Sequence, residues 1–332
     1  SGQELVLQLA LAANQTDFVQ LGAAVPNAAF LPLRALQRSL GKAARSYQQY
    51  ANYTFPPGLP QLQEEIARRM RIAGDVVNPQ DLVITDGCQE AVALSLRAVA
   101  KAGDVIAIES PTFYGLLQVI ESLGMKALEI PTDPQQGMSL AALQMAVEQW
   151  PVKACVTIPN FSNPLGSLMP DEQKKALVKL ARKHRFALIE DDIYGDLGFA
   201  GERPRSLKSF ADDPLDQVYY CSSFSKTVSP GLRCGWVHAP LGSVERIMYL
   251  KHVSNLATSS ISQVALADYL AQGNHERYLR QVQTLYRQQV ELFSQAISKY
   301  FPAGTRVTQP AGGVVLWVEC DPCIDTLALT HR

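Results

Sequence analysis

The sequence predicts an α/β fold in which a mostly parallel, seven-stranded sheet lies between helices and a smaller α+β region follows. Two observations lead to this prediction. Between residues 82 and 237, short runs of apolar and β-branched residues alternate with helical stretches, and such runs are typical of strands buried on both faces of a parallel sheet. After residue 244 a long amphipathic pattern replaces the alternation, which indicates a second, smaller unit.

Seven segments have the composition and length of buried strands. In chain order they are residues 82–85, 104–108, 125–130, 153–158, 186–189, 218–221 and 234–237. Helical stretches separate them, and we expect helices at about 89–101, at 113–123, after 139 and at 170–184. The last of these begins at Pro170, and proline is favoured in the first turn of a helix because the missing N–H would have no partner there.

The C-terminal part is expected to begin with one long helix. Over residues 275–300 the apolar positions recur at helical spacing, and they form a stripe of Val282, Leu285, Tyr286, Leu292, Phe293, Ala296 and Ile297. Residues 313–319 are rich in valine and are expected to form a strand.

Composition and charge argue against several classes of protein. The chain has 332 residues, 47% of them hydrophobic, and a net charge of −1, so charge alone indicates neither a nucleic-acid-binding nor a membrane-binding surface. No apolar run reaches the roughly 18 residues that span a bilayer, and the first residues lack a signal-peptide pattern. The six cysteines are scattered, and Cys320 and Cys323 lack the second ligand pair of a zinc site. We therefore expect a cytoplasmic protein with reduced thiols and no membrane contact.

Residues 223–233 carry the most informative motif. They read Ser-Phe-Ser-Lys-Thr-Val-Ser-Pro-Gly-Leu-Arg, so that Lys226 follows Ser223 and Ser225 and precedes Arg233. This motif resembles the pyridoxal-phosphate lysine signature of the fold-type I, class I and II aminotransferases. The resemblance implies that the Lys226 amine forms a Schiff base with the aldehyde of pyridoxal 5'-phosphate, while Ser223, Ser225 and Arg233 hold the phosphate. A lone lysine after a strand is more often a solvated surface residue, so the assignment depends on the other motifs.

Acidic residues at the end of one predicted strand are candidates to hold the pyridine nitrogen of the cofactor. A carboxylate there keeps the nitrogen protonated and the ring electron-accepting. Residues 189–194 read Ile-Glu-Asp-Asp-Ile-Tyr, and the family pattern of an aspartate followed three residues later by a tyrosine selects Asp191 and Tyr194. Asp192 remains an alternative for the same role. The resemblance implies that Tyr194 donates to the phenolic oxygen of the cofactor and that Lys226, Asp191 and Tyr194 are the catalytic residues.

Two further loops match the same family. Asn163 opens an Asn-Pro turn after a predicted strand, and the resemblance implies that its side chain bonds the same phenolic oxygen. Residues 86–89 join a strand to a helix, and the free N–H groups at the N-terminus of a helix bind phosphate. A glycine allows the backbone to approach a ligand closely, so the expected phosphate contacts from this loop are Gly87, Cys88 and Gln89.

Aromatic residues complete the pattern. By its spacing from Pro111, Phe113 resembles the aromatic residue that stacks on the cofactor ring, with Tyr114 as the alternative. Tyr53, which is followed five residues later by a glycine, resembles the family tyrosine that reaches the phosphate in the partner subunit. A homodimer with shared sites is therefore implied. Residues 22–32 resemble the N-terminal segment that lies over the substrate.

The resemblance also implies how the chain is organised. Residues 1–45 are expected to form an N-terminal arm and part of a small domain, and residues 46–243 the large cofactor-binding domain. Residues 244–332 are expected to form a connecting helix and an incomplete small domain. Its C-terminal part, with the arginine that binds the substrate carboxylate, would lie beyond residue 332.

Several segments are most similar to the aminotransferase-like effector domain of MocR-type regulators of the GntR family: residues 30–32, 52–62, 152–155, 190–192 and 221–226. This resemblance implies a domain that senses a small amine or amino acid through Lys226, with DNA bound only by a domain absent from this chain. The alternative is a catalytic aminotransferase for an amino acid such as aminoadipate or an aromatic one, because the same residues serve both functions. A structural domain without cofactor is disfavoured, since all the site motifs are present.

Overall fold

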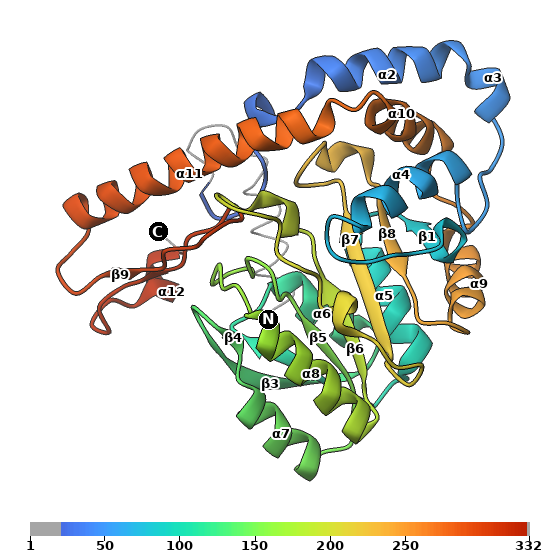
Figure 1. Ribbon diagram of the computed structural model, residues 1–332. Coiled ribbons are helices and arrows are strands. Elements are labelled where there is room, and N and C mark those ends of the chain that lie inside the picture. Colours follow the sequence, from blue (N-terminus) through green and yellow to red (C-terminus); the bar gives the residue numbers. More distant parts are fainter. Residues whose placement is uncertain (1–20, 331–332) are drawn as a thin grey trace.

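The computed structural model describes residues 21–330 and is built around one eight-stranded sheet. The strands lie in the order β1-β8-β7-β6-β5-β2-β3-β4 (Figure 1). Their bounds are β1 Leu82–Thr85, β2 Val105–Ser110, β3 Lys126–Asp133, β4 Gly137–Met138, β5 Val152–Thr157, β6 Ala187–Asp191, β7 Val218–Ser223 and β8 Gly235–His238. The pairs that join β3, β2, β5, β6 and β7 are parallel, whereas β8 is antiparallel to both β7 and β1.

The predicted α/β fold is confirmed, and all seven predicted strands are present. The eighth strand, β4, was not predicted. It has two residues and pairs with the end of β3, and two residues are too few to show a periodic sequence signal.

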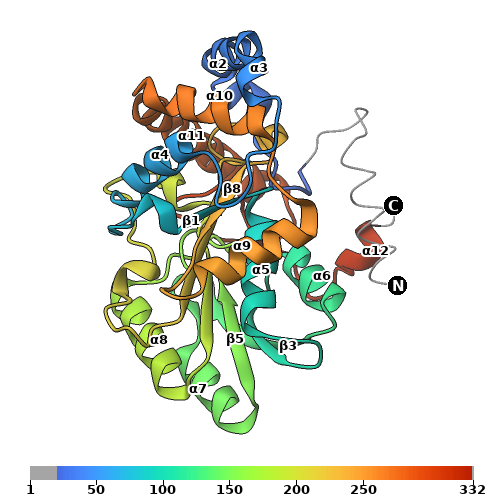
Figure 2. The same ribbon diagram turned by 90° about the vertical axis from the view of Figure 1, so that its right-hand side faces the viewer.

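Alternating side chains of the central strands bury against helices on opposite faces of the sheet. On one face, Ile108, Val156 and Ile189 pack with the helices α5 (Cys88–Val99), α6 (Tyr114–Ser122) and α9 (Val244–Asn255). On the other face, Cys155 and Leu188 pack with α7 (Leu140–Gln149) and α8 (Asp171–His184). Figure 2 shows α8 and α7 to the left of β5, α5 and α6 to its right, and α9 in front. Because both faces are covered, the strands are apolar throughout.

A third group of helices covers the β1 end of the sheet. It consists of α2 (Leu33–Arg45), α4 (Pro60–Met70) and α10 (Ser260–Ala271), and it shares a buried cluster with Leu82, Tyr220 and Trp236. The short α3 (Tyr47–Tyr50) follows α2. Helix α2 is further held to α10 by the Ser39 hydroxyl, which donates to Asp268 at 2.8 Å.

The long helix predicted at 275–300 is confirmed as α11 (His275–Tyr300). Its predicted apolar stripe is only partly buried: Val282 and Tyr286 lie in the core, whereas Leu292 is 58% exposed. Figure 1 shows the reason, since the C-terminal half of α11 extends beyond the sheet. The division into residues 1–45, 46–243 and 244–332 stays a prediction.

The strand predicted at 313–319 is largely wrong. Only Val318–Glu319 (β10) is extended and paired, with Arg306–Val307 (β9), before the short α12 (Thr326–Thr330). The preceding residues follow an irregular path, in which Gly313 has a positive φ of 82° that favours glycine.

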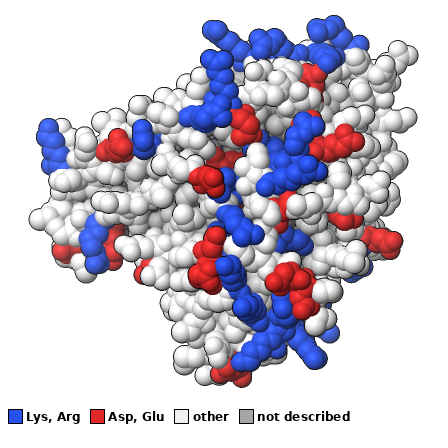
Figure 3. All heavy atoms as spheres, viewed as in Figure 1, with Lys and Arg blue, Asp and Glu red and all other residues white. Residues whose placement is uncertain are grey.

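Charged side chains of both signs lie on the face seen in Figure 3. Within residues 21–330, no helix is both long enough and apolar enough to cross a membrane.

One substitution tests the third helix group. Ile66 in α4 is fully buried in it, so Ile66→Ala should lower the free energy of unfolding by about 2–5 kcal/mol through lost contacts and a cavity. Ile72, two residues beyond α4, is 50% exposed, and Ile72→Ala is the matched control with an expected change of about 0.5 kcal/mol. Urea unfolding of both variants measures the difference. Equal losses would contradict the packing described here.

Candidate functional site

A cavity of about 1250 Å³ opens at the carboxyl ends of β5, β6 and β7. In open parallel sheets this edge is where ligands bind. Ten of the twelve predicted site residues line it: Cys88, Gln89, Phe113, Asn163, Asp191, Tyr194, Ser223, Ser225, Lys226 and Arg233. The other two predicted residues, Gly87 and Tyr53, do not line the cavity.

Lys226 lies half-buried on the loop after β7. Its Nζ donates to the carbonyl oxygen of Ala24 at 2.5 Å, so the segment that begins at Leu21 passes close to it. Burial lowers the pKa of the Lys226 amine; nearby Asp191 raises this pKa, and Arg233 lowers it further. A lowered pKa increases the neutral fraction, which is the nucleophilic form of a lysine.

Asp191 stands at the end of β6 with its carboxylate in the cavity. Its Oδ1 accepts the Cys88 thiol and the Ile193 N–H, both at 3.2 Å. Burial raises the pKa of Asp191 to about 6, although these two hydrogen bonds and the charge of Lys226 lower it. A positive group bound beside Asp191 would therefore stabilise its ionised form.

Asp192 does not line the cavity. Its carboxylate is buried and accepts from Asn160 Nδ2 at 2.9 Å, from the Tyr220 hydroxyl at 2.9 Å and from Arg203 Nη2 at 2.6 Å. Successive side chains of an extended strand point to opposite sides, so the alternation at the end of β6 sends Asp191 and Asp192 apart. Of the two candidates for a cavity carboxylate, the geometry favours Asp191.

Tyr194 and Asn163 come from different loops and meet at the cavity wall. Asn163 Nδ2 donates to the Tyr194 hydroxyl at 3.4 Å. Burial raises the pKa of the Tyr194 hydroxyl, which therefore stays protonated and can donate. The Tyr194 hydroxyl and the Asn163 amide thus lie side by side in the cavity wall, and both can donate hydrogen bonds.

Another part of the cavity wall has the features of an anion site. Helix α5 begins at Cys88, and Gly87 before it has a φ of 91°. Arg233 Nη2 donates to the carbonyl oxygen of Asp86 at 2.7 Å, and a Cβ on Gly87 would stand 2.5 Å from that nitrogen. Only glycine therefore lets the guanidinium lie against the start of α5. Free backbone N–H groups, a helix dipole and an arginine converge there, beside the hydroxyls of Ser223 and Ser225.

Both aromatic candidates, Phe113 and Tyr114, line the cavity, and their rings are 5.0 Å apart. Tyr114 is 46% exposed, whereas Phe113 packs against the cluster that contains Tyr194. The Phe113 ring folds over Gly115, where an added Cβ would come within 2.4 Å of it. The packing therefore fixes Phe113 more firmly than Tyr114.

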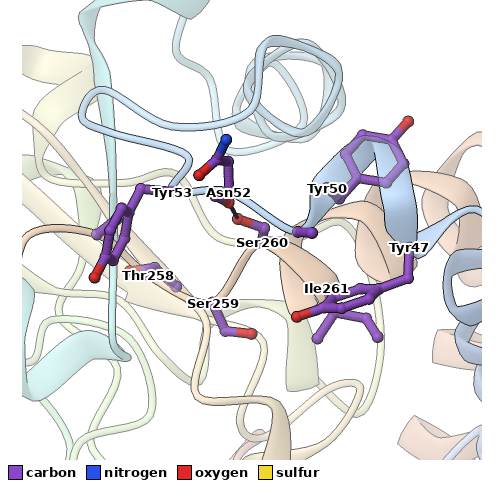
Figure 4. Close-up of a pocket in the computed structure, with 10 residues that line it drawn as sticks. Tyr47, Tyr50, Asn52, Tyr53, Thr258, Ser259, Ser260 and Ile261 are labelled. Atoms are coloured by element: carbon purple, nitrogen blue, oxygen red, sulfur yellow. Dashed lines mark hydrogen bonds between the residues drawn. The ribbon is translucent and has the colours of Figure 1, made fainter.

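Tyr53 lies outside the Lys226 cavity and is 63% exposed. It lines a separate surface pocket of about 440 Å³ together with Tyr47, Tyr50 and Ser259 (Figure 4). Its ring packs on Phe55 with the centroids 5.4 Å apart. Its contact with a partner subunit stays a prediction.

Three residues near the site were not identified from the sequence. Glu109 is fully buried, accepts from the Thr157 hydroxyl at 2.7 Å, and has a pKa raised by burial to about 7. Asn160 and Arg203 hold Asp192. Asn160 lies three residues before Asn163, in the same loop. No sequence signal distinguishes Arg203 from a surface arginine.

Comparison with known proteins identifies the family of this chain. The sequence model of the family described as aminotransferase class I and II matches residues 8–330. The HTH-type transcriptional regulator YjiR of Escherichia coli is 37% identical over 98% of this chain and 69% of its own length. Aromatic-amino-acid aminotransferase 1 of Thermococcus litoralis is 27% identical over 96% of this chain and 77% of its own.

Among solved structures, kynurenine aminotransferase of Pyrococcus horikoshii, in complex with PMP, superposes with a TM-score of 0.89. The two chains are 27% identical, and the superposition covers 99% of this chain and 82% of the Pyrococcus horikoshii chain. The predicted resemblances to fold-type I aminotransferases and to MocR-type regulators are thereby confirmed.

The two aspartates should respond oppositely to the same substitution. The pKa of Asp191 rises from 3.8 unfolded to about 6 folded, so its ionisation lowers stability progressively between these pH values. Asp191→Asn should therefore raise the free energy of unfolding at pH 7 by about 1–3 kcal/mol, with little change near pH 4. Asp192→Asn should lower it by about 3 kcal/mol, because Arg203 loses a buried partner.

Urea unfolding of both variants at pH 4 and pH 7 checks this. A stabilised Asp192→Asn protein, or a destabilised Asp191→Asn protein, would mean that the two roles are reversed.

Proposed function

This chain belongs to the aminotransferase class I and II family, and we propose that it binds pyridoxal 5'-phosphate covalently at Lys226. The observation that supports this most is the convergence in one cavity of an amine, a carboxylate and an anion site from three separate loops. The PMP in the Pyrococcus horikoshii relative supports it as well, since PMP is the amine form of this cofactor.

The donor set fits each part of the cofactor. The α5 N-terminus, Arg233, Ser223 and Ser225 would hold the phosphate. Asp191 would hold the ring nitrogen, and Tyr194 with Asn163 the phenolic oxygen. Phe113, which lines the cavity, would cover one face of the ring. When bound, the cofactor supplies an aldehyde and a ring that draws electrons from an attached amine carbon.

Each residue contributes a separate physical effect. Lys226 would anchor the cofactor through its Nζ, and its lowered pKa favours the neutral, nucleophilic amine. Asp191 would keep a proton on the ring nitrogen, since a positive ring would offset the cost of the buried charge of Asp191. Tyr194 and Asn163 would donate to the ring oxygen and stabilise negative charge there.

Within the family, we propose that the chain is the effector-sensing domain of a MocR-type regulator. The 37% identity to YjiR, against 27% to the Thermococcus litoralis enzyme, supports this. A small amine or amino acid would displace Lys226 from the cofactor and bind one arrangement of the domain better than another. DNA binding would belong to a domain outside residues 1–332. The domain would act as a homodimer in which Tyr53 reaches the partner's site.

A catalytic aminotransferase is the second candidate. The relatives that are aminotransferases support it, and the residues that accept a substrate amine are the same in both proposals. In that case Lys226 would also act as the acid–base group that moves a proton from the α-carbon of the amino acid to the former aldehyde carbon of the cofactor. The amino acid would be aminoadipate or an aromatic one.

Borohydride reduction tests the anchor. The protein incubated with pyridoxal 5'-phosphate should carry a reduced cofactor on the peptide that contains Lys226, detected by mass spectrometry. Lys226→Ala should abolish this label and retain weaker, phosphate-held binding; Lys179→Ala, at an exposed position of α8, should leave the label unchanged. Undiminished labelling of Lys226→Ala would place the anchor elsewhere.

Product release separates the two candidates. For a sensor, mixing the cofactor-loaded protein with L-2-aminoadipate or L-tyrosine should change the cofactor absorbance without repeated release of oxo acid. The oxo acid is measured by mass spectrometry with an acceptor oxo acid in excess. Many turnovers per protomer would establish the aminotransferase instead.

A further inference from the structure

One arginine, Arg203, holds the turn that carries Tyr194. Arg203 donates through Nη2 to Asp192 at 2.6 Å and through Nε to Asp196 at 2.5 Å. Asp192 and Asp196 lie on either side of Tyr194 in the sequence, two residues from it in each direction. A single rigid guanidinium, which does not line the cavity, therefore bridges both ends of the turn.

Gly195 makes this bridge possible. A Cβ at this position would stand 2.4 Å from Asp192 Oδ1 and 2.7 Å from Arg203 Nη2. Both contacts are shorter than non-bonded atoms allow, so the turn passes directly over the ion pair. The backbone next to Tyr194 is thus in contact with the bridge.

The same bridge reaches the loop of Asn163. Asp192 Oδ1 accepts from Asn160 Nδ2 at 2.9 Å, and Asn160 Oδ1 in turn accepts from the buried Lys174 Nζ at 2.7 Å. Asn160 precedes Asn163 by three residues. One buried carboxylate therefore ties together the two loops whose side chains meet at the cavity wall.

The network also extends to the helices around the site. Arg69 in α4 donates to Asp196 at 2.7 Å and to Glu276 in α11 at 2.5 Å. Gln283 in α11 donates to the Asp196 carbonyl oxygen at 2.9 Å. Further along α11, Tyr286 lines the cavity. The turn is thereby fixed relative to two helices.

We propose that Arg203 is a positioning residue for Tyr194 and Asn163: by bridging Asp192 and Asp196 it sets where the Tyr194 hydroxyl and the Asn163 amide stand in the cavity. The proposal rests on the cofactor-binding function proposed above. Arg203 does not line the cavity and acts only through the two carboxylates.

A purely stabilising role explains this cluster poorly. Removing charges from water is costly, and a buried ion pair is often no more stable than an apolar pair of the same volume. Asp196 nevertheless stays ionised: burial raises its pKa, but the nearby charges of Arg69 and Arg203 lower the pKa by more. Such a cluster instead provides directional hydrogen bonds. Each bond allows only a narrow range of lengths and angles, and several bonds together hold the turn in one position.

The test is a pH titration of the absorbance of bound pyridoxal 5'-phosphate, with urea unfolding measured in parallel. Hydrogen bonds from Tyr194 and Asn163 to the ring oxygen favour its ionised form, so misplacing them should raise the midpoint. Arg203→Lys keeps the charge but cannot bridge two carboxylates in the same geometry, and it should raise the midpoint by about 1 pH unit. Tyr194→Phe should raise it at least as much.

Two controls isolate positioning from stability. Arg182→Lys disrupts a comparable bridge to Asp212 and Asp216, which do not line the cavity, and should leave the midpoint unchanged. Gln283→Met removes one bond to the turn and should raise the midpoint slightly, whereas Gln288→Met, at an exposed position of the same helix, should not. If Arg203→Lys does not fold, the difference between Gln283→Met and Gln288→Met tests whether the contacts of the turn set the position of Tyr194.

The outcomes separate the two proposals. A wild-type protein that neither binds nor is labelled by the cofactor would overturn the proposed function. A wild-type protein that binds normally, with unchanged midpoints in Arg203→Lys and Gln283→Met but a raised midpoint in Tyr194→Phe, would overturn the positioning role alone.

Discussion

The site depends on one constraint: parallel neighbouring strands end at the same edge of a sheet. Strands β5, β6 and β7 lie side by side and parallel, so the loops that carry Asn163, Asp191 and Lys226 leave the sheet together although they are more than 60 residues apart at the extremes. The antiparallel β8 closes the arrangement. Its Gly235 lies so close to the start of α5 that a Cβ would stand 2.7 Å from the Gly87 carbonyl carbon, which brings Arg233 against the anion site.

Side chains alternate between the two sides of a strand, and at the end of β6 the consecutive acids Glu190, Asp191 and Asp192 lie in three different environments. Glu190 accepts the backbone N–H groups of Leu207 and Lys208, Asp191 faces the cavity, and Asp192 joins Arg203. Their electrostatics differ accordingly. Burial raises the pKa of Glu190 to about 8 and that of Asp191 to about 6, whereas Asp192 has an arginine beside it. Of the three acids, Asp191 is the one in the cavity, and no cationic side chain lies at hydrogen-bonding distance from it among the described residues, so that a positive ring would complete the pair.

Sensing and transamination begin from the same arrangement of residues, because each requires an incoming amine to replace Lys226. What would distinguish them is how firmly the proton-handling groups are held once the amine is bound. Catalysis requires reacting groups placed to within about half an ångström, whereas a sensor requires two arrangements of similar free energy. The buried bridge between Arg203, Asp192 and Asp196 bears on this difference, since it connects the cavity wall to α4 and α11.

The sequence by itself determined where the seven predicted strands and the long helix lie along the chain, because these depend on local periodicity. Its short motifs, through their resemblance to those of the aminotransferase family, identified ten of the residues that line the cavity. The family pattern selected Asp191 and left Asp192 as an alternative, and the folded strand decides that Asp191 faces the cavity. Arg203 had no sequence signal, because its role arises from contacts with Asp192 and Asp196 that only folding creates. The prediction of a strand at 313–319 was largely wrong for the same reason: a strand needs a paired neighbour, and among residues 21–330 only its last two residues have one.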